Sequence, residues 1–380
     1  MTKRKWWAIV LVSALLISLI PIKEVQAVSV SSRNAVLLDQ DSGRILFEKD
    51  AHNKERIASI TKIMTAIIAV ESGMMQNTVT VSDKAAFTEG SSLYLKPGQK
   101  EKLQDLVYGL MLRSGNDAAV AIAEHVGGSL EGFVYLMNEK AELIGMKNTH
   151  FANPHGLDDH ENHVSTAYDM AILMQYAMKN EEFAIISGTE AYRSKDPSAD
   201  WDRVWKNKNR LLTEKYQYCT GGKTGYTKRA KRTLVTTASQ GDQNLIVVTL
   251  NGPDDWNDHI QLYEYGFQNY DNKVFFAEGE EVKVEDKFYQ GHLSVEHNVM
   301  YPIHKDKEEE VKVDIQVIKP KWDEEKDVPK HIGNLSLTLN NQIVSSAPII
   351  FSYEKSEEKK SFFEWFKGIF STMIGLNYNG

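Results

Sequence analysis

Ser59-Ile60-Thr61-Lys62 opens the stretch of sequence that decides how this chain is organised. From Ser59 to Glu71, apolar residues recur at intervals of three and four, which predicts a helix. A serine and a lysine three positions apart lie on the same face of such a helix. A serine hydroxyl needs a neighbouring base before it can act as a nucleophile. The pair Ser59 and Lys62 is therefore a candidate for nucleophilic catalysis.

The motif Lys223-Thr224-Gly225 supplies a second lysine. A lysine acts as a base only when its pKa is lowered, by desolvation or by a neighbouring cation. Apolar residues around Lys62 provide part of the desolvation, and Lys223 is the candidate cation. Lys223 and Thr224 can also bind a terminal carboxylate, while Gly225 lets a ligand backbone approach a strand closely.

The third motif, Ser114-Gly115-Asn116, falls on a loop between helices predicted at 103–112 and 118–125. Ser114 is expected to relay protons between the two lysines. Asn116 has both a donor and an acceptor, so it can hold Lys62 and a substrate amide together. Each motif is weak alone, but the three in this order predict one catalytic site built from a helix, a loop and a strand.

The surrounding pattern places strands at both ends of a block of helices. The elements predicted are strands at 35–39 and 44–48, helices at 59–71, 103–112, 118–125, 131–144 and 165–178, strands at 233–238 and 245–250, and a closing helix at 259–270. Ser165 is the expected N-cap of the helix at 165–178. This order predicts an α/β sheet whose strands come from distant parts of the chain.

The three motifs together are the set found in penicillin-binding proteins and class A β-lactamases, where Asp stands in the middle of the second motif. Residues 30–270 resemble the low-molecular-mass penicillin-binding proteins that are D-alanyl-D-alanine carboxypeptidases of the S11 type. The resemblance extends through Asn153-Pro154-His155-Gly156-Leu157, through 163–169 and through 222–227. The sequence after Lys223 is most similar to the sporulation-associated enzymes of Gram-positive spore formers.

This resemblance implies a β-lactamase/DD-peptidase-like fold, in which helices and a helical subdomain flank an antiparallel sheet. It implies an acyl-enzyme on Ser59 and an oxyanion hole formed by the backbone N–H groups of Ser59 and Tyr226. The expected substrates are peptidoglycan stem peptides ending in D-Ala-D-Ala, with β-lactam antibiotics as covalent inhibitors. No cofactor and no metal is expected.

One segment departs from the family pattern. Many relatives carry an arginine after the strand that follows Lys-Thr-Gly, where it helps to hold the substrate carboxylate. Here the corresponding residues 252–259 contain no arginine. Capture of the carboxylate is therefore assigned to Lys223 and Thr224. A nearby basic cluster is a weaker candidate for this role, and it consists of Lys228, Arg229, Lys231 and Arg232.

Two other functions compete with a carboxypeptidase. A class A β-lactamase adds a glutamate that activates the deacylating water, in a Glu-x-x-x-Asn setting. No such spacing occurs between Asn116 and Lys223, so rapid penicillin turnover is disfavoured. A non-catalytic protein that binds wall fragments or β-lactams is the other alternative, but it has no need for Lys62.

Several reactive residue types have a simpler interpretation. Cys219 is the one cysteine of the chain and is expected to be a structural thiol. The histidines between His150 and His163 lie in a loop without a fixed carboxylate partner, which argues against zinc. His163 and Asp169 are expected to hold the fold through hydrogen bonds.

The amino terminus predicts export. A basic start is followed by an apolar run from Trp6 to Ile20 and by Val25-Gln26-Ala27, which is typical of a cleaved signal peptide over residues 1–27. An uncleaved N-terminal anchor is the alternative, and both predict a protein outside the cytoplasm. The expected location is the outer face of the cytoplasmic membrane or the cell wall. The segment carries a net charge of +3, so its removal changes the net charge from −8 to −11. A surface this acidic argues against nucleic acid as a partner.

The carboxyl-terminal part differs in composition from the catalytic domain, which is predicted at 28–272. Alternating charged and β-branched residues predict a separate β-rich domain at 275–354. Residues 361–376 follow a charged linker and place five aromatic side chains on one broad face of a predicted helix. Such an amphipathic helix is typical of a segment that lies on a membrane surface.

Overall fold

The computed structural model describes residues 28–195, 201–318, 322 and 327–352. Its centre is an antiparallel five-stranded sheet that joins the amino-terminal strands to strands some two hundred residues later. In spatial order the strands are β2 (Ile45–Lys49), β1 (Asn34–Asp39), β9 (Gln243–Leu250), β8 (Lys231–Gln240) and β7 (Cys219–Thr227). β7 is an edge strand of this sheet.

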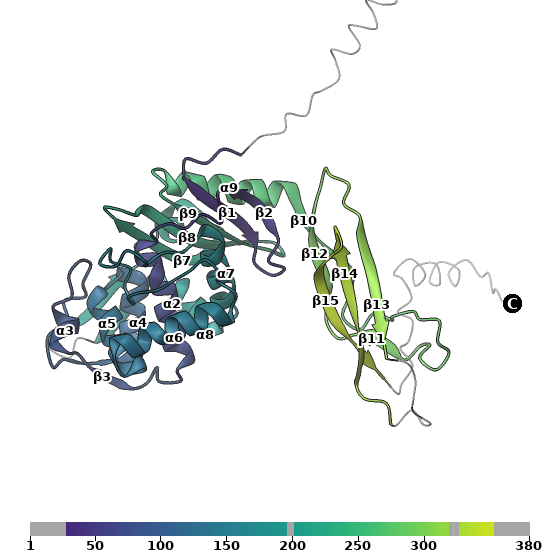
Figure 1. Cartoon of the computed structure of the whole chain (residues 1–380), viewed down its shortest axis with the longest axis horizontal. Helices are drawn as coiled ribbons and strands as arrows, with labels where there is room; N and C mark the ends of the chain where they lie inside the picture. The colour runs from purple at the N-terminus through teal and green to yellow at the C-terminus, as the bar shows by residue number, and fades with distance from the viewer. Residues whose placement is uncertain (1–27, 196–200, 319–321, 323–326, 353–380) are drawn as a thin grey trace, which may run out of the picture. The chain divides into compact units, whose positions relative to one another are not determined.

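Helices cover both faces of the sheet. Figure 1 shows α9 (Asp255–Asn269) on one side and α2 (Lys62–Glu71) and α7 (Ala167–Met178) on the other. The strand alternation explains this, because successive side chains point to opposite faces. Val235 belongs to the large apolar core that contains α2, whereas Thr236 hydrogen-bonds to His259 of α9 at 2.7 Å.

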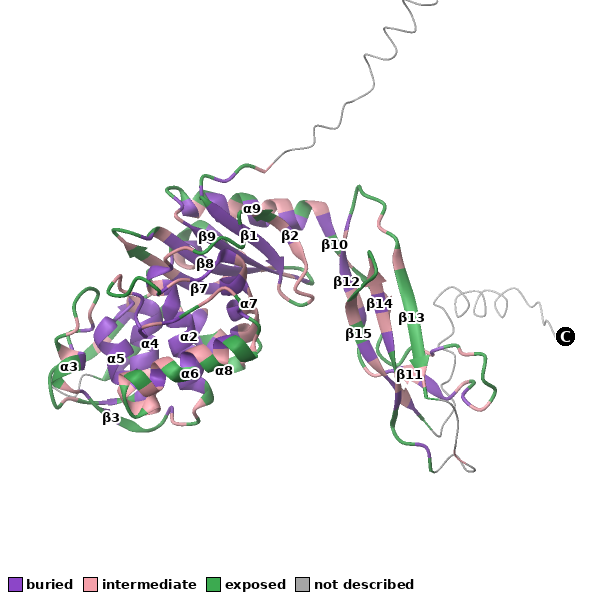
Figure 2. Cartoon of the chain, viewed as in Figure 1, coloured by how far each residue is buried: buried purple, intermediate pink, exposed green. Residues whose placement is uncertain are grey.

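A helical subdomain packs against α2. Its elements are the 3₁₀ turn η1 (Ala58–Thr61), α3 (Asp83–Ala86), α4 (Leu103–Arg113), α5 (Asn116–Gly127), α6 (Leu130–Leu143), α8 (Glu181–Ser187), the hairpin β3 (Thr78–Thr80) with β4 (Lys100–Lys102), the hairpin β5 (Ala191–Lys195) with β6 (Asp202–Lys206), and the π-helical turn η2 (Leu211–Lys215). Figure 2 shows that α2 is buried along most of its length. Every residue from Lys62 to Val70 is buried, so this helix forms the centre of the core.

The α/β fold predicted from sequence is confirmed, with corrections at the ends of elements. Ser59 lies in a 3₁₀ turn rather than in the α-helix itself, and α2 begins at Lys62. The N-cap of α7 is Thr166, whose side chain accepts a hydrogen bond from the Asp169 N–H. Ser165 cannot serve there because its backbone pairs with Glu55. The closing helix begins at Asp255, four residues earlier than expected.

The carboxyl-terminal part has its own core. β10 (Tyr270–Phe276) pairs with β12 (Val299–His304), and a four-stranded antiparallel sheet has the order β11 (Leu293–Val295), β15 (Gln342–Phe351), β14 (His331–Leu339) and β13 (Val311–Val317). Leu335, Leu337 and Ile349 are buried in this core. The edge strand β13 is largely exposed (Figure 2).

The predicted signal peptide at 1–27 and the predicted amphipathic helix at 361–376 lie outside the described residues. Among the residues that the structure does describe, no helix combines the length and the apolar character needed to span a bilayer.

Candidate active site

The three sequence motifs converge on Lys62, the first residue of α2. Its side-chain nitrogen forms hydrogen bonds with the Ser59 hydroxyl at 3.1 Å and with Asn116 Oδ1 at 2.7 Å. A third hydrogen bond, of 2.7 Å, reaches the backbone carbonyl of His155. Lys62 is fully buried, and these three acceptors are neutral. The lysine therefore sits beside the serine hydroxyl without the carboxylate partner that would hold its proton.

The surroundings of Lys62 favour its neutral form. Burial is the largest cause that lowers its pKa well below the ordinary value for lysine, and the nearby cations Lys223 and Lys208 lower it further. The buried carboxylate of Asp117 acts in the opposite direction but does not offset them. A neutral lysine amine at 3.1 Å from the Ser59 hydroxyl is a base in reach of its proton.

Lys223 lies on the edge strand β7 and is 2% exposed. It donates to the Ser114 hydroxyl at 3.1 Å and to the carbonyl of Thr224 at 2.7 Å. Burial, assisted by the charge of Lys208, lowers the pKa of Lys223 to about 7. Below that pH Lys223 carries its proton, and it then presents a cation to the strand edge.

The second motif is held in place by backbone geometry. Ser114 ends α4 in the left-handed conformation, with φ of 65°, and Asn116 begins α5. The Asn116 amide donates to the carbonyl of Glu89 at 2.7 Å, which leaves its second N–H for a ligand. Of the relay expected between the two lysines, the described structure has the contact between Ser114 and Lys223, whereas Lys62 bonds to other groups.

Gly225 brings β7 against the segment that carries Ser59. A side chain at Gly225 would place its Cβ 3.0 Å from the Ser59 nitrogen and 2.3 Å from the Thr233 hydroxyl. Thr233 in turn donates to the carbonyl of Ile57 at 3.0 Å. Glycine is needed at this position because no Cβ fits between the strand and the turn.

The loop at 153–157 packs on the same segment from the other side. Gly156 has φ of 87°, and a Cβ there would lie 1.9 Å from the carbonyl oxygen of Ala58. Ala58 itself has φ of 49°, so the backbone entering Ser59 is strained. His163 holds this arrangement: it accepts from the Ala152 N–H at 3.0 Å and contacts the Thr61 hydroxyl at 2.8 Å.

Two contributors to the site were missed from the sequence. Lys208 is a third lysine, exposed at the surface, whose charge lowers the pKa of both Lys62 and Lys223. It lies in no recognisable motif, so no spacing signal could have indicated it. The His155 carbonyl is the second, and a backbone carbonyl cannot be recognised from the residue type. The resemblance of residues 153–157 to the family was the one sequence feature that pointed to this loop.

The basic cluster after β7 has other partners. Arg229 forms a two-pronged ion pair with Glu161, and Arg232 pairs with Asp255 at 2.6 Å and lies over the Trp256 ring. Lys228 and Lys231 are exposed. The two arginines are thus already neutralised, which weakens their case as carboxylate binders.

The contacts of Cys219 and Asp169 indicate a role in the fold rather than in catalysis. Burial raises the pKa of the Cys219 thiol to about 11, so it stays protonated at neutral pH, as a structural thiol does. Asp169 accepts from the Asn148 N–H and the Thr149 hydroxyl, both at 2.7 Å, in keeping with its expected role in holding the fold. Within the described ranges, no three histidine, cysteine, aspartate or glutamate side chains are grouped to hold a metal.

Comparison with known proteins defines the class of this chain. Residues 22–254 match the family described as D-alanyl-D-alanine carboxypeptidase, and residues 270–356 match the C-terminal domain of penicillin-binding protein 5. The chain belongs to the D-alanyl-D-alanine carboxypeptidase family.

Individual relatives agree with this assignment. The chain is 36% identical over 260 residues to D-alanyl-D-alanine carboxypeptidase DacF of Bacillus subtilis, with 66% of each protein in the match. It is 33% identical over 303 residues to DacA of Haemophilus influenzae, covering 74% of this chain and 75% of that protein. The matches span 66% of the length of DacF and 63% of that of DacC of Escherichia coli.

Solved structures extend the likeness to both domains. The crystal structure of penicillin-binding protein 5 from Haemophilus influenzae superposes with a TM-score of 0.70 at 28% identity, and covers 88% of this chain and 100% of that one. The D-alanyl-D-alanine carboxypeptidase of Mycobacterium tuberculosis gives a TM-score of 0.61 at 31% identity, with 65% of this chain and 95% of that chain covered.

Proposed function

We propose that this protein is a serine-type D-alanyl-D-alanine carboxypeptidase, which removes the terminal D-alanine from peptidoglycan stem peptides and binds penicillin covalently. The observation that carries the proposal is the buried Lys62 amine, 3.1 Å from the Ser59 hydroxyl and hydrogen-bonded to neutral acceptors. Membership of the carboxypeptidase family supports the choice of substrate.

In the proposed acylation step, Ser59 Oγ attacks the carbonyl carbon of the penultimate D-alanine. Neutral Lys62 takes the hydroxyl proton, and the backbone N–H groups of Ser59 and Tyr226 stabilise the negative oxygen. The C–N bond to the terminal D-alanine then breaks, and its amine takes up a proton as it leaves. Water attacks the resulting ester on Ser59, which releases the shortened peptide and restores the hydroxyl.

The substrate is proposed to lie along the edge of β7. Lys223 and Thr224 bind the terminal carboxylate, and the nearby charge of the exposed Lys208 adds positive potential. Asn116 holds the substrate amide through the N–H that Glu89 does not use. Ser114, in contact with Lys223, passes a proton toward the leaving amine. Lys223, with the charge of Lys208 near it, thus supplies the positive charge that an arginine supplies in many relatives.

The β-lactamase alternative finds less support. In the described part of the chain, the hydrogen-bond partners of Ser59, Lys62 and Lys223 include no carboxylate that could activate a water for rapid deacylation. A stable penicillin adduct is therefore expected rather than rapid turnover. A purely non-catalytic binding protein would not require the costly burial of Lys62.

The cellular setting is proposed from the sequence. Residues 1–27 direct export, the catalytic domain spans 28–272, and the β-rich domain spans 275–354. The segment 361–376 binds the membrane surface and keeps the enzyme at the outer face of the cytoplasmic membrane. The subgroup is proposed to be the sporulation-associated one of Gram-positive bacteria.

The test is labelling with a fluorescent penicillin, combined with release of D-alanine from a wall pentapeptide. The wild-type chain should be labelled and should lose the label slowly, and it should release D-alanine. The Ser59→Ala variant should not be labelled and should not release D-alanine, while it keeps the wild-type unfolding temperature. Equal labelling of the Ser59→Ala variant would contradict the assignment of the nucleophile. Rapid loss of the label from wild type would instead support a β-lactamase.

A further inference from the structure

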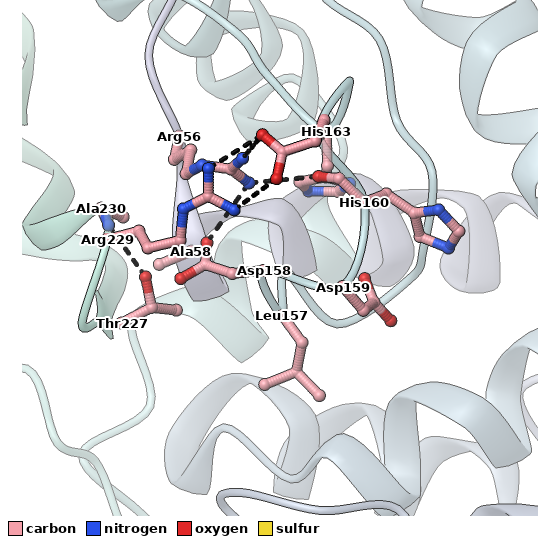
Figure 3. Close-up of polar contacts among 12 residues, drawn as sticks. Arg56, Ala58, Leu157, Asp158, Asp159, His160, His163, Thr227, Arg229 and Ala230 are labelled. Carbon is pink, nitrogen blue, oxygen red and sulfur yellow. Dashed lines mark hydrogen bonds and ion pairs between the residues drawn. The ribbon is translucent and has the colours of Figure 1, made fainter.

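One carboxylate joins three segments that meet beside Ser59. Both oxygens of Glu161 accept hydrogen bonds from the Arg229 guanidinium, at 2.7 and 2.8 Å. Arg56, three residues before Ser59, donates to the same carboxylate at 2.6 Å. Figure 3 shows Arg56 and Arg229 reaching toward one another, from the segment before Ser59 and from the turn between β7 and β8.

The two ends of this link differ in exposure. The Arg56 side chain is 13% exposed and also donates to the His160 carbonyl at 3.1 Å, so its position is fixed. The Glu161 side chain is 80% exposed and that of Arg229 is 48% exposed. Exposed ion pairs add little to stability, but a two-pronged arginine–carboxylate pair fixes geometry. The link is therefore suited to set positions rather than to hold the fold together.

The loop that carries Glu161 is already tied to the nucleophile segment. The His155 carbonyl accepts from Lys62, and Gly156 packs against the carbonyl of Ala58. His163, at the far end of the loop, contacts the Thr61 hydroxyl. Glu161 adds a connection of a different kind, because Arg229 belongs to the turn that ends β7. The strand β7 carries Tyr226, three residues before Arg229.

We propose that Glu161 is a positioning residue whose ion pairs with Arg56 and Arg229 hold the end of β7 against the segment that enters Ser59. The link fixes the spacing between the Ser59 hydroxyl and the N–H of Tyr226. This inference rests on the proposed function, because the spacing matters only if both groups act on one carbonyl. A displacement of about 1 Å can slow a reaction by roughly 100-fold, so a small shift is measurable.

The experiment measures the second-order rate constant of acylation by a fluorescent penicillin, using the full chain. Glu161→Gln should react about five-fold more slowly than wild type, with an unchanged unfolding temperature. The matched control is Glu296→Gln in the β-rich domain, because Glu296 is also held by two basic side chains, Lys330 at 2.7 Å and His331 at 2.9 Å. That variant should react at the wild-type rate.

Two further measurements separate positioning from a general effect of charge. Arg229→Gln should match Glu161→Gln, and the double variant should be no slower than either single one. High salt should slow wild type toward the rate of Glu161→Gln and leave that variant unaffected, because exposed charges are screened.

The proposal has clear ways to fail. Equal rates for wild type and Glu161→Gln at low salt would overturn it, as would additive effects of the two substitutions or an equal loss in Glu296→Gln. A wild-type chain that did not label at all would instead overturn the assignment of Ser59, and the inference with it.

Discussion

The lysines of the active site and the arginines beside the turn after β7 illustrate two uses of positive charge. Lys62 and Lys223 are buried and contact hydroxyls, an amide oxygen and backbone carbonyls. Arg229 and Arg232 are partly exposed, and each pairs with a carboxylate. The first arrangement lowers a pKa and makes a base, whereas the second keeps a fixed charge and joins segments.

The comparison shows that partners, rather than residue type, decide what a cation does. Lys62 begins α2, Lys223 lies on β7, Arg232 lies on β8, and Arg229 lies in the turn between these two strands. In the sequence alone, nothing distinguishes the environments of these four basic residues. Desolvation without an anion costs free energy, and that cost appears as a shifted pKa. A carboxylate in contact with the cation offsets the cost of desolvation, so the cation keeps its proton and does not act as a base.

The largest effect is expected at Lys62. Lys62→Met keeps most of the length of the side chain but removes the amine, so acylation by penicillin should fall by about 1,000-fold or more. The fold should not be weakened at pH 7. The folded pKa of Lys62 is lowered, so the wild-type chain is penalised below the unfolded pKa of lysine, and the penalty fades as the pH rises toward that value.

Rate and unfolding temperature measured across pH check both parts of this prediction. The stability advantage of the Lys62→Met variant should shrink between pH 7 and pH 10. A variant that kept wild-type acylation would remove Lys62 from the role of base.

Ser114→Ala should have a smaller effect on catalysis. The substitution removes the hydroxyl that accepts from Lys223 at 3.1 Å, while the contacts of Lys62 remain. We expect D-alanine release to fall by about 100-fold, chiefly in kcat, because proton transfer to the leaving amine is impaired. Steady-state kinetics on a wall pentapeptide measure it, and a change confined to KM would place Ser114 in binding instead.

Lys223 should give the alkaline limb of the pH profile. Burial and Lys208 lower its pKa to about 7, so kcat/KM for a peptide should fall above that pH by up to about ten-fold per pH unit. In Lys223→Arg the guanidinium stays charged, and the limb should disappear even if the rate is lower. An identical limb in that variant would assign the titration to another group.

Arg232 should have the smallest catalytic effect. Arg232→Gln leaves the 3% exposed Asp255 without its ion-pair partner, which should cost about 1–3 kcal/mol of stability. The kcat/KM should remain within about two-fold of wild type, since the buried Lys223 supplies the cation that binds the substrate carboxylate. Chemical unfolding and peptide kinetics test the two halves. A loss of carboxylate binding in this variant would restore the basic cluster as a substrate site.

The sequence predicted what depends on local pattern. The three motifs, their order and the alternation of strands and helices sufficed to predict the α/β fold and to nominate Ser59, Lys62 and Lys223. Capping was less predictable, because Ser165 and Thr166 are both good caps and a backbone pairing with Glu55 decides between them.

The parts that the sequence did not predict depend on tertiary contacts. The charge of Lys208 acts on two lysines that lie elsewhere in the chain, and no spacing rule connects them. Glu161 meets Arg56 and Arg229 because loops fold back over long sequence separations. From the sequence alone, Glu161 cannot be distinguished from any other glutamate at the protein surface.

The burial of α2 from Lys62 to Val70 has a consequence for how this protein loses activity. A helix enclosed by other elements exchanges its amide protons only when the whole domain opens. Because Lys62 begins this helix, local opening of surface hairpins should leave the base in place. On heating, hydrogen exchange in α2 and loss of penicillin labelling should therefore occur together, as a single transition.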